Sequence, residues 1–226
     1  MQAKRFGAMM GRGTTAMVRA GERKLAWLLG GVYCACLLAQ AQQPEPALAR
    51  LNESGQIVVA GRATPYLIRH LPVSSFPELP GEFAALLSRR GCLIPQTYEA
   101  HRPENVIHGS FERAGSLDWA VLCSESGSGR GTVSLIVFFA SAPAKLLVLA
   151  SGPETERLQA HDRSGVLGFN WGIDPASPER VRQAQAGMAH RPALLGHDAV
   201  ADSIVDGRIV YHFYARDAWT VLDVPE

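Results

Sequence analysis

A short apolar block behind a basic N-terminus constrains this chain more than any other feature of its sequence. Residues 1–24 hold six Lys or Arg and one acid, and residues 25–39 (LAWLLGGVYCACLLA) carry no charge. About fifteen residues suit the apolar part of a signal peptide, whereas a membrane-spanning helix needs roughly twenty. The block ends in Ala-Gln-Ala at 39–41, a small-x-small cleavage pattern. We predict a signal peptide over residues 1–41, with an uncleaved N-terminal anchor as the alternative.

Removal of the signal peptide changes the charge of the chain. Residues 1–41 hold six of the 22 basic residues and one of the 21 acidic ones, so residues 42–226 hold 16 and 20, a net charge of −4. Nucleic-acid binding and membrane-surface binding depend on clustered Lys and Arg, and no such run remains. We predict a soluble domain, periplasmic or extracellular, with no nucleic-acid partner and no integral membrane segment after cleavage. A small molecule, a glycan and a protein stay open as ligand classes.

The cysteines agree with export. Cys34 and Cys36 leave with the signal peptide, and Cys92 and Cys123 remain. In an oxidising compartment such a pair is a candidate disulfide, which closes a loop of about thirty residues and contributes about 3 kcal/mol. Two separate buried thiols are the alternative. No C-x-x-C spacing is present, so the cysteines predict no metal site.

The rest of the chain predicts a flexible leader and one domain. Residues 42–54 are polar and contain proline, and residues 55–226 are long enough for a single globular domain with its own core. Runs of strand-forming residues predict strands at 56–60, 65–71, 105–111, 117–123, 132–140, 145–150, 199–205, 208–214 and 219–224.

Two segments predict helices. Residues 81–90 (GEFAALLSRR) place three apolar side chains on one helical face, and Gly91 is suited to end the helix. Ser-Pro-Glu at 177–179 supplies an N-cap, a first-turn proline and an early acid for a second helix that runs to about residue 186.

Turn residues connect the predicted strands as hairpins. Residues 124–131 (SESGSGRG) predict a flexible turn, and Asp206-Gly207 predicts a type I′ hairpin. Strands in antiparallel groups with helices between them indicate an α+β fold, with an antiparallel sheet of meanders and hairpins and about two helices.

One stretch carries Gly-Ser-Phe at 109–111, Asp-Trp-Ala-Val-Leu at 118–122 and Val-Ser-Leu-Ile-Val at 133–137. Over about thirty residues it resembles one degenerate unit of the FG-GAP or VCBS-type repeat, which implies a hairpin with a calcium loop. Ser110, Glu112 and Ala114 stand where the family has alternate Asp or Asn ligands, although Asp118 is kept. Because a hard cation needs six to eight oxygen ligands, we predict no metal.

Two other stretches, at 118–123 (DWAVLC) and 170–175 (NWGIDP), look like those of uncharacterised exported bacterial proteins. That resemblance implies that the protein is exported, and it indicates no particular activity. The glycines of residues 127–131 lie between two predicted strands and precede no helix, so they predict no phosphate cradle and no cofactor.

Catalytic candidates come from histidines with an acid beside them. Of seven histidines, His161 and His197 are each followed directly by Asp. A histidine generally points away from its sequence neighbour, so a catalytic group would have to form in the fold. A hydrolase of this kind would draw on His161, Asp174, His197 and Asp198, and two of these histidines near a carboxylate in a concave pocket would support it.

Residues 165–175 (GVLGFNWGIDP) predict a loop rich in large aromatic residues. Phe169 and Trp171, with Asn170 between them, would suit stacking on a sugar or a peptide if exposed. The alternative, which we favour, is that both rings fill the core beneath the loop. The sequence therefore favours a non-catalytic binding or envelope-associated module, with a secreted or periplasmic hydrolase as the alternative.

Overall fold

Strands dominate the part of the chain that the structure describes. This computed structural model describes residues 51–125, 131–188, 190, 191 and 195–223. The predicted signal peptide, residues 42–50 of the predicted leader and residues 126–130 of the predicted glycine-rich turn lie outside the described residues.

The larger of two sheets has nine strands, in the order β7-β6-β5-β3-β2-β9-β8, with β1 paired to β2 and β4 paired to β5. Its strands are β1 (Asn52–Val59), β2 (Arg62–Pro72), β3 (Cys92–Gln96), β4 (Val106–Gly109), β5 (Asp118–Glu125), β6 (Thr132–Phe138), β7 (Leu146–Pro153), β8 (Leu158–Ala160) and β9 (Leu167–Phe169). Its strand pairs are antiparallel except β2 with β9, which is parallel.

The smaller sheet is an antiparallel meander. Its four strands are β10 (Trp171–Ala176), β11 (Ala199–Ile204), β12 (Ile209–Ala215) and β13 (Ala218–Asp223), in that order. The hairpin predicted at Asp206-Gly207 is confirmed, since β11 and β12 pair antiparallel on either side of it. Its predicted turn type is wrong, because a type I′ turn needs positive φ at both central residues and only Asp206, with φ of 55°, has it; Gly207 does not.

The two helices follow the sequence closely. Helix α1 (Gly81–Arg89) is followed by Gly91 with φ of 70°, the left-handed conformation of a helix C-terminal glycine. Helix α2 (Pro178–Ala184) begins at Ser177, whose hydroxyl accepts a hydrogen bond from the backbone N–H of Arg180. The predicted α+β class with two helices is confirmed.

The larger sheet departs from the predicted antiparallel arrangement at one pair, because β2 is longer than its neighbour β3. β3 pairs only with Arg69–Pro72 of β2, which leaves the same edge free at Tyr66 and Leu67. Strand β9 pairs there in parallel. The partner comes from a distant part of the chain, so no local pattern indicates it.

The loop predicted at residues 165–175 is also wrong, since β9 and β10 occupy most of it. Its large apolar residues alternate at 167, 169, 171 and 173, which is strand periodicity, and all four are buried. The glycines at 168 and 172 resemble loop signals and obscure this pattern. Strand β3 was not predicted, and β1 begins at Asn52, inside the predicted leader.

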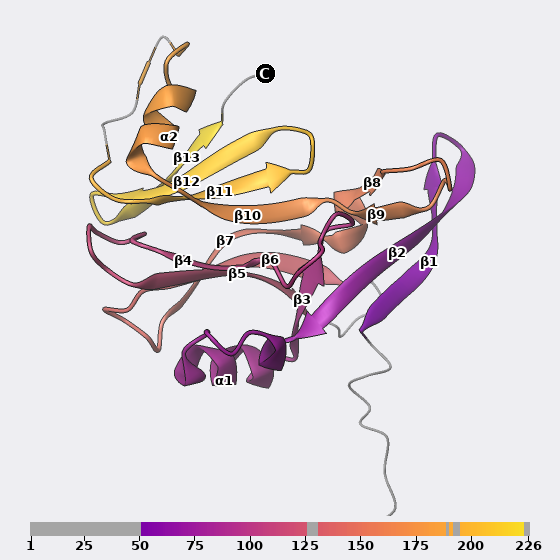
Figure 1. Cartoon of the computed structure of the whole chain (residues 1–226), viewed down its shortest axis with the longest axis horizontal. Helices are drawn as coiled ribbons and strands as arrows, with labels where there is room; N and C mark the ends of the chain where they lie inside the picture. Colours follow the sequence, from indigo (N-terminus) through magenta and orange to yellow (C-terminus); the bar gives the residue numbers. More distant parts are fainter. Residues whose placement is uncertain (1–50, 126–130, 189, 192–194, 224–226) are drawn as a thin grey trace, which may run out of the picture. The chain divides into compact units, whose positions relative to one another are not determined.

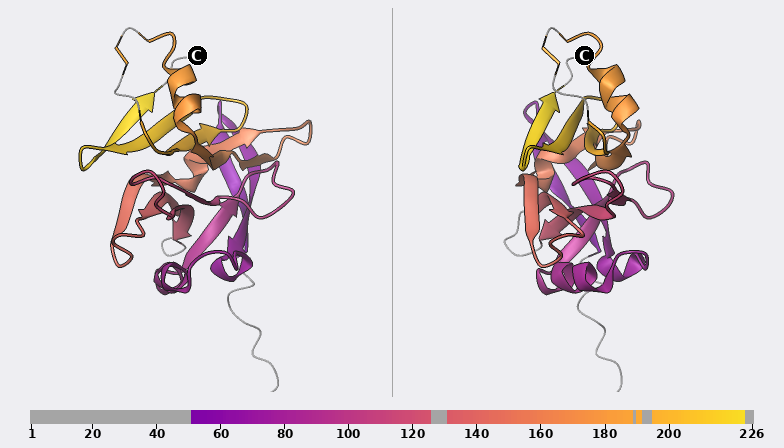
Figure 2. Two further views of the ribbon diagram at one scale, coloured as in Figure 1. Left: turned by 60° about the vertical axis from the view of Figure 1, so that its left-hand side comes forward. Right: turned by 90° about the vertical axis from the view of Figure 1, so that its left-hand side faces the viewer.

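The helices and sheets stack in four layers (Figure 1; Figure 2). Helix α1 packs on one face of the larger sheet through Phe83 and Leu87, which join a cluster with Val121 and Ile136. Helix α2 packs on the smaller sheet through Val181. The two sheets face each other between the helices.

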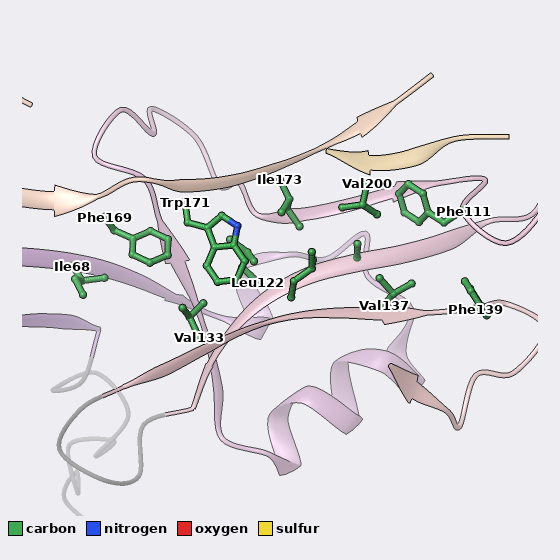
Figure 3. Packing of buried hydrophobic residues seen from close by; sticks show 12 residues of the cluster. Ile68, Phe111, Leu122, Val133, Val137, Phe139, Phe169, Trp171, Ile173 and Val200 are labelled. Atoms are coloured by element: carbon green, nitrogen blue, oxygen red, sulfur yellow. The ribbon is translucent and has the colours of Figure 1, made fainter. Parts of the chain in front are cut away.

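The third apolar cluster fills the space between the sheets. Figure 3 shows Trp171, Ile173 and Val200 of the smaller sheet over Leu122, Val133 and Val137 of the larger one. The central strands β5 and β6 are therefore covered on both faces, because their alternate side chains enter the clusters of the two sides. This two-sided cover explains why β5 is buried from Asp118 to Ser124.

The predicted disulfide between Cys92 and Cys123 is confirmed. It joins the start of β3 to β5, with the two Cα atoms 5.3 Å apart. Both cysteines are buried in the cluster beneath α1.

Replacing both cysteines by alanine is expected to lower the free energy of unfolding by about 3 kcal/mol, since the bridge limits the freedom of the unfolded chain. Urea unfolding followed by tryptophan fluorescence measures this change. Reductant should reproduce it in the wild type and leave the double variant unaffected. Equal unfolding midpoints for wild type and variant under oxidising conditions would contradict the expectation.

Candidate functional site

The loop of residues 97–104, between β3 and β4, is held closed at its two ends by side chains. The Gln96 side-chain amide donates to the carbonyl of Glu104 at 3.1 Å, and its oxygen accepts from the backbone N–H of Glu104 at 3.0 Å. The Glu104 carboxylate in turn accepts from the backbone N–H of Thr97 at 2.7 Å. The loop is therefore a fixed part of the fold, and we call it the 97–104 loop.

Asn105 follows this loop and ties the two sheets together. Its side-chain N–H groups donate to the carbonyls of Pro95 at 2.8 Å and Trp171 at 3.2 Å, and its side-chain oxygen accepts from the N–H of Ile173 at 3.1 Å. Its own carbonyl accepts from Leu122 at 3.0 Å. Asn105 is 2% exposed and has φ of 69°, a conformation that asparagine tolerates better than most residues.

A pocket of about 360 Å³ lies on one side of the 97–104 loop, and we call it the Tyr98 pocket. Its walls include the rings of Tyr98 and His161, which stack with their centroids 4.4 Å apart and their planes at 11°. Gly168 lies directly beneath these rings. A Cβ at this position would stand 2.5 Å from Cβ of Tyr98 and 3.0 Å from the His161 ring, so the stack requires glycine here.

The floor of the Tyr98 pocket is apolar and its rim is charged. Phe169 and Leu167 form part of the lining, and Leu67 is 48% exposed beside them. The Arg69 guanidinium lies at the pocket and donates to the carbonyl of Ala100 at 2.6 Å; its other N–H groups have no hydrogen-bond partner among the residues that the structure describes.

Asp162 supplies the negative charge of this rim. Hydrogen bonds from the hydroxyl and the backbone N–H of Ser164 lower the pKa of the Asp162 carboxyl, so it is ionised at neutral pH. Burial, together with the negative charge of Glu99, raises the pKa of the Tyr98 phenol, which therefore keeps its proton.

A second pocket, of about 530 Å³, lies between the 97–104 loop, β4, β10 and the turn after β11. Asp174 lines it, and we call it the Asp174 pocket. Thr97 lines both pockets. One loop thus contributes a wall to each of two pockets.

The structure places the four catalytic candidates at three different locations. His161 lines the Tyr98 pocket and Asp174 lines the other pocket. The Asp198 carboxylate accepts from the backbone N–H of Ser110 at 3.0 Å, which links β11 to the segment after β4, and the His197 ring contacts the carbonyl of Asp198. Within the described ranges, no hydrogen bond joins these candidates into one catalytic group.

The aromatic residues expected in an open loop are in the core. Phe169 and Trp171 are 1% and 0% exposed, which confirms the alternative of core packing. Asn170 is buried as well, and its side chain donates to Gln159 at 2.9 Å. The Trp171 indole N–H donates to Asp202, and the His212 ring is 3.1 Å from the other oxygen of that carboxylate.

Sequence reasoning missed the buried polar pairs. His70 of β2 and Glu154, which follows β7, are 2% and 1% exposed and lie 2.8 Å apart, although 84 residues separate them. Asp202 and His212 form the second pair. The alternating pattern of β11 and β12 could have placed the latter two on one sheet, but nothing local brings His70 to Glu154.

The stretch with the repeat-like sequence uses its one retained acid for folding. Asp118 is fully buried and accepts hydrogen bonds from the backbone N–H groups of Glu112 at 2.7 Å and Ala140 at 2.9 Å and from the Ser116 hydroxyl. No group of three or more His, Cys, Asp or Glu residues in the described part of the chain is placed to hold a metal ion.

No protein-family model, no curated protein and no solved structure matches this chain. In the residues that the structure describes, no helix combines the length and the apolar character needed to cross a membrane. The disulfide is compatible with an oxidising compartment.

Replacing Asn105 by alanine is expected to lower the free energy of unfolding by about 3 kcal/mol, because it leaves buried backbone groups unpaired and forces alanine into the left-handed region. Asn105→Gly keeps the backbone conformation and should cost roughly 1 kcal/mol less than the alanine variant. Urea unfolding of both variants measures the difference. An unfolding free energy of Asn105→Ala equal to that of the wild type would show that the amide does not hold the sheets together.

Proposed function

We propose that this protein is an exported, non-catalytic binding module and that the Tyr98 pocket is its ligand site. The stacked rings over Gly168 are the observation that carries the proposal. Because residue 168 is glycine, the two rings can stack at the wall of the pocket. The wall is then in place before a ligand binds, as in most small-molecule sites. The pocket volume of about 360 Å³ lies within the usual range for small-molecule sites.

The lining of the Tyr98 pocket favours a planar apolar ligand that carries a carboxylate. Leu67, which is 48% exposed, offers apolar surface, and the edge of the Tyr98 and His161 stack suits a flat ring. Arg69 supplies free guanidinium N–H groups for an acid at the rim, and such charge-assisted hydrogen bonds are strong. Aromatic acids are therefore the ligand class we propose.

Binding is preferred over hydrolysis because of where the candidate catalytic residues lie. Only His161 lines the Tyr98 pocket, and the carboxylate nearest to it, Asp162, is 3.7 Å from its Nδ1 atom and accepts instead from Ser164. The Asp198 carboxylate accepts a hydrogen bond from the backbone N–H of Ser110 and so joins the segments before β11 and after β4. No observation favours a hydrolase specifically, so we do not propose one.

Export is supported by the N-terminal sequence and by the disulfide. The basic stretch, the uncharged block of residues 25–39 and the Ala-Gln-Ala sequence form a complete signal. A bridge between Cys92 and Cys123 forms and persists in oxidising compartments outside the cytoplasm.

The binding proposal predicts that indole-3-acetate binds the protein and that tryptamine, which has the same ring and a positive charge, does not. Titration calorimetry measures both. Gly168→Ala should weaken indole-3-acetate binding at least tenfold, since its methyl group displaces the ring stack. Arg69→Gln should reduce affinity for the acid more than affinity for indole-3-acetamide.

A matched control is Gly152→Ala on β7, where the nearest atom to the added Cβ would be 3.8 Å away. This variant should bind like the wild type. The proposal fails if indole-3-acetate and tryptamine bind equally, if neither binds, or if Gly168→Ala folds and retains full affinity.

Export predicts a secreted product that starts at Gln42 and is two hydrogens lighter than its reduced form. Intact-mass analysis of the protein from a bacterial host, with and without reductant, measures both properties. Ala41→Arg should block cleavage, because signal peptidases require a small residue there, whereas Ala47→Arg should be processed normally. Full-length protein retained in the cytoplasm would contradict export.

A further inference from the structure

Strands β1 and β2 form a hairpin at one side of the larger sheet (Figure 1). Ile68 and His70 of β2 are 0% and 2% exposed and point into the protein, so the alternate residues of this strand point outward. Leu67 and Arg69 are two of these outward residues, and both line the Tyr98 pocket. The outer face of the hairpin is therefore continuous with the pocket.

An apolar strip runs along this outer face, away from the pocket. Leu67 is followed on the same face of β2 by Pro65 and Ala63, and Val58 of β1 pairs directly with Ala63. All four residues are exposed, Val58 at 75% and Leu67 at 48%. We call them the hairpin strip. Between its ends on β2 the strand rises about 13 Å, the length of about four residues of an extended peptide.

Uncharged polar side chains flank the hairpin strip. Ser54 and Gln56 of β1 are exposed and pair with strip residues of β2, so they share the outer face. Their hydroxyl and amide groups can each donate and accept hydrogen bonds, as a peptide backbone requires. The acid of this strand, Glu53, lies on the opposite face, where it accepts from the Tyr66 hydroxyl at 3.1 Å.

A positive charge stands at the pocket end of the strip. Arg69 follows Leu67 on the outer face, and its guanidinium donates to the carbonyl of Ala100 at 2.6 Å. Its remaining N–H groups have no hydrogen-bond partner within the described ranges. Guanidinium groups bind carboxylates through short, charge-assisted hydrogen bonds. A peptide that follows the strip inward therefore reaches a cation and a pocket with an aromatic wall at the same point.

We infer that the Tyr98 pocket and the hairpin strip together bind the C-terminal segment of a peptide that ends in an aromatic residue. This inference rests on the proposed function of the pocket. The terminal carboxylate bonds to Arg69, the terminal ring enters the pocket beside the Tyr98 and His161 stack, and the preceding residues lie extended on the strip. An internal segment of a protein fits less well, because it has no carboxylate to place at Arg69.

Titration calorimetry of the mature protein with the peptide acetyl-Ala-Val-Ala-Trp tests this inference. The peptide should bind about tenfold more tightly than acetyl-tryptophan, since its additional residues bury apolar surface on the strip. The same peptide with a C-terminal amide should bind about tenfold more weakly than the acid, since the charge-assisted bonds to Arg69 are lost.

Val58→Asp should reduce affinity for the acidic peptide about tenfold, because a charged group replaces an apolar contact. It should leave indole-3-acetate binding unchanged, because Val58 is not among the residues that line the pocket. The matched control is Val221→Asp on β13 of the smaller sheet, where the valine is 57% exposed. This variant should bind the peptide like the wild type, and indole-3-acetate binding shows that both variants are folded.

The inference is overturned if the peptide binds no more tightly than acetyl-tryptophan, if its amide binds as well as the acid, or if the two aspartate variants have equal effects. It is also overturned if the strip is a contact between two copies of this chain, which light scattering would show as a dimer that Val58→Asp dissociates. If indole-3-acetate binds and the longer peptide gains nothing, the inference fails and the proposed function stands. If neither ligand binds, both fail.

Discussion

The side-chain amide of Asn105 links the two sheets of this structure. It bonds the carbonyls of Pro95 and Trp171 and the N–H of Ile173, and so joins the larger sheet to the smaller one at the point where the 97–104 loop returns. Both pockets take part of their lining from that loop. Because a buried amide without partners is costly, the geometry of the loop depends on all three bonds being made. Together with the hydrogen bonds of Gln96 and Glu104, Asn105 therefore holds the loop that lines both pockets.

Acidic residues of this protein stabilise the fold through hydrogen bonds, even where the sequence suggests metal binding or catalysis. Asp118 accepts from two backbone N–H groups, Asp198 links β11 to the segment after β4, and Asp202 bonds the Trp171 indole. A buried carboxylate needs hydrogen bonds or a partner charge, and here strands and side chains of the core supply them. Glu99 and Asp174, which have no such partner among the described residues, line the Asp174 pocket.

The two pockets differ in chemistry because the 97–104 loop presents different residues to each side. Towards β9 it offers Tyr98, which stacks with His161 over an apolar floor beside Arg69. Towards β10 it offers Glu99 and Glu104, which face Asp174. The loop turns at residues 97–100, where the backbone N–H of Ala100 donates to the carbonyl of Thr97 at 3.2 Å.

Local patterns in the sequence determined the two helices and the hairpin at Asp206-Gly207, because helix caps and turn residues act on their near neighbours. Composition determined the disulfide, because only two cysteines follow the predicted signal peptide. The tertiary structure alone decided the parallel pairing of β2 with β9, the burial of Phe169 and Trp171, and the meeting of His70 with Glu154. These contacts join segments that lie far apart in the chain, and their free energy depends on both partners at once. The glycine at 168 illustrates the difference: alone it resembles a loop signal, and in the fold its lack of a side chain leaves room for the Cβ of Tyr98 and the ring of His161.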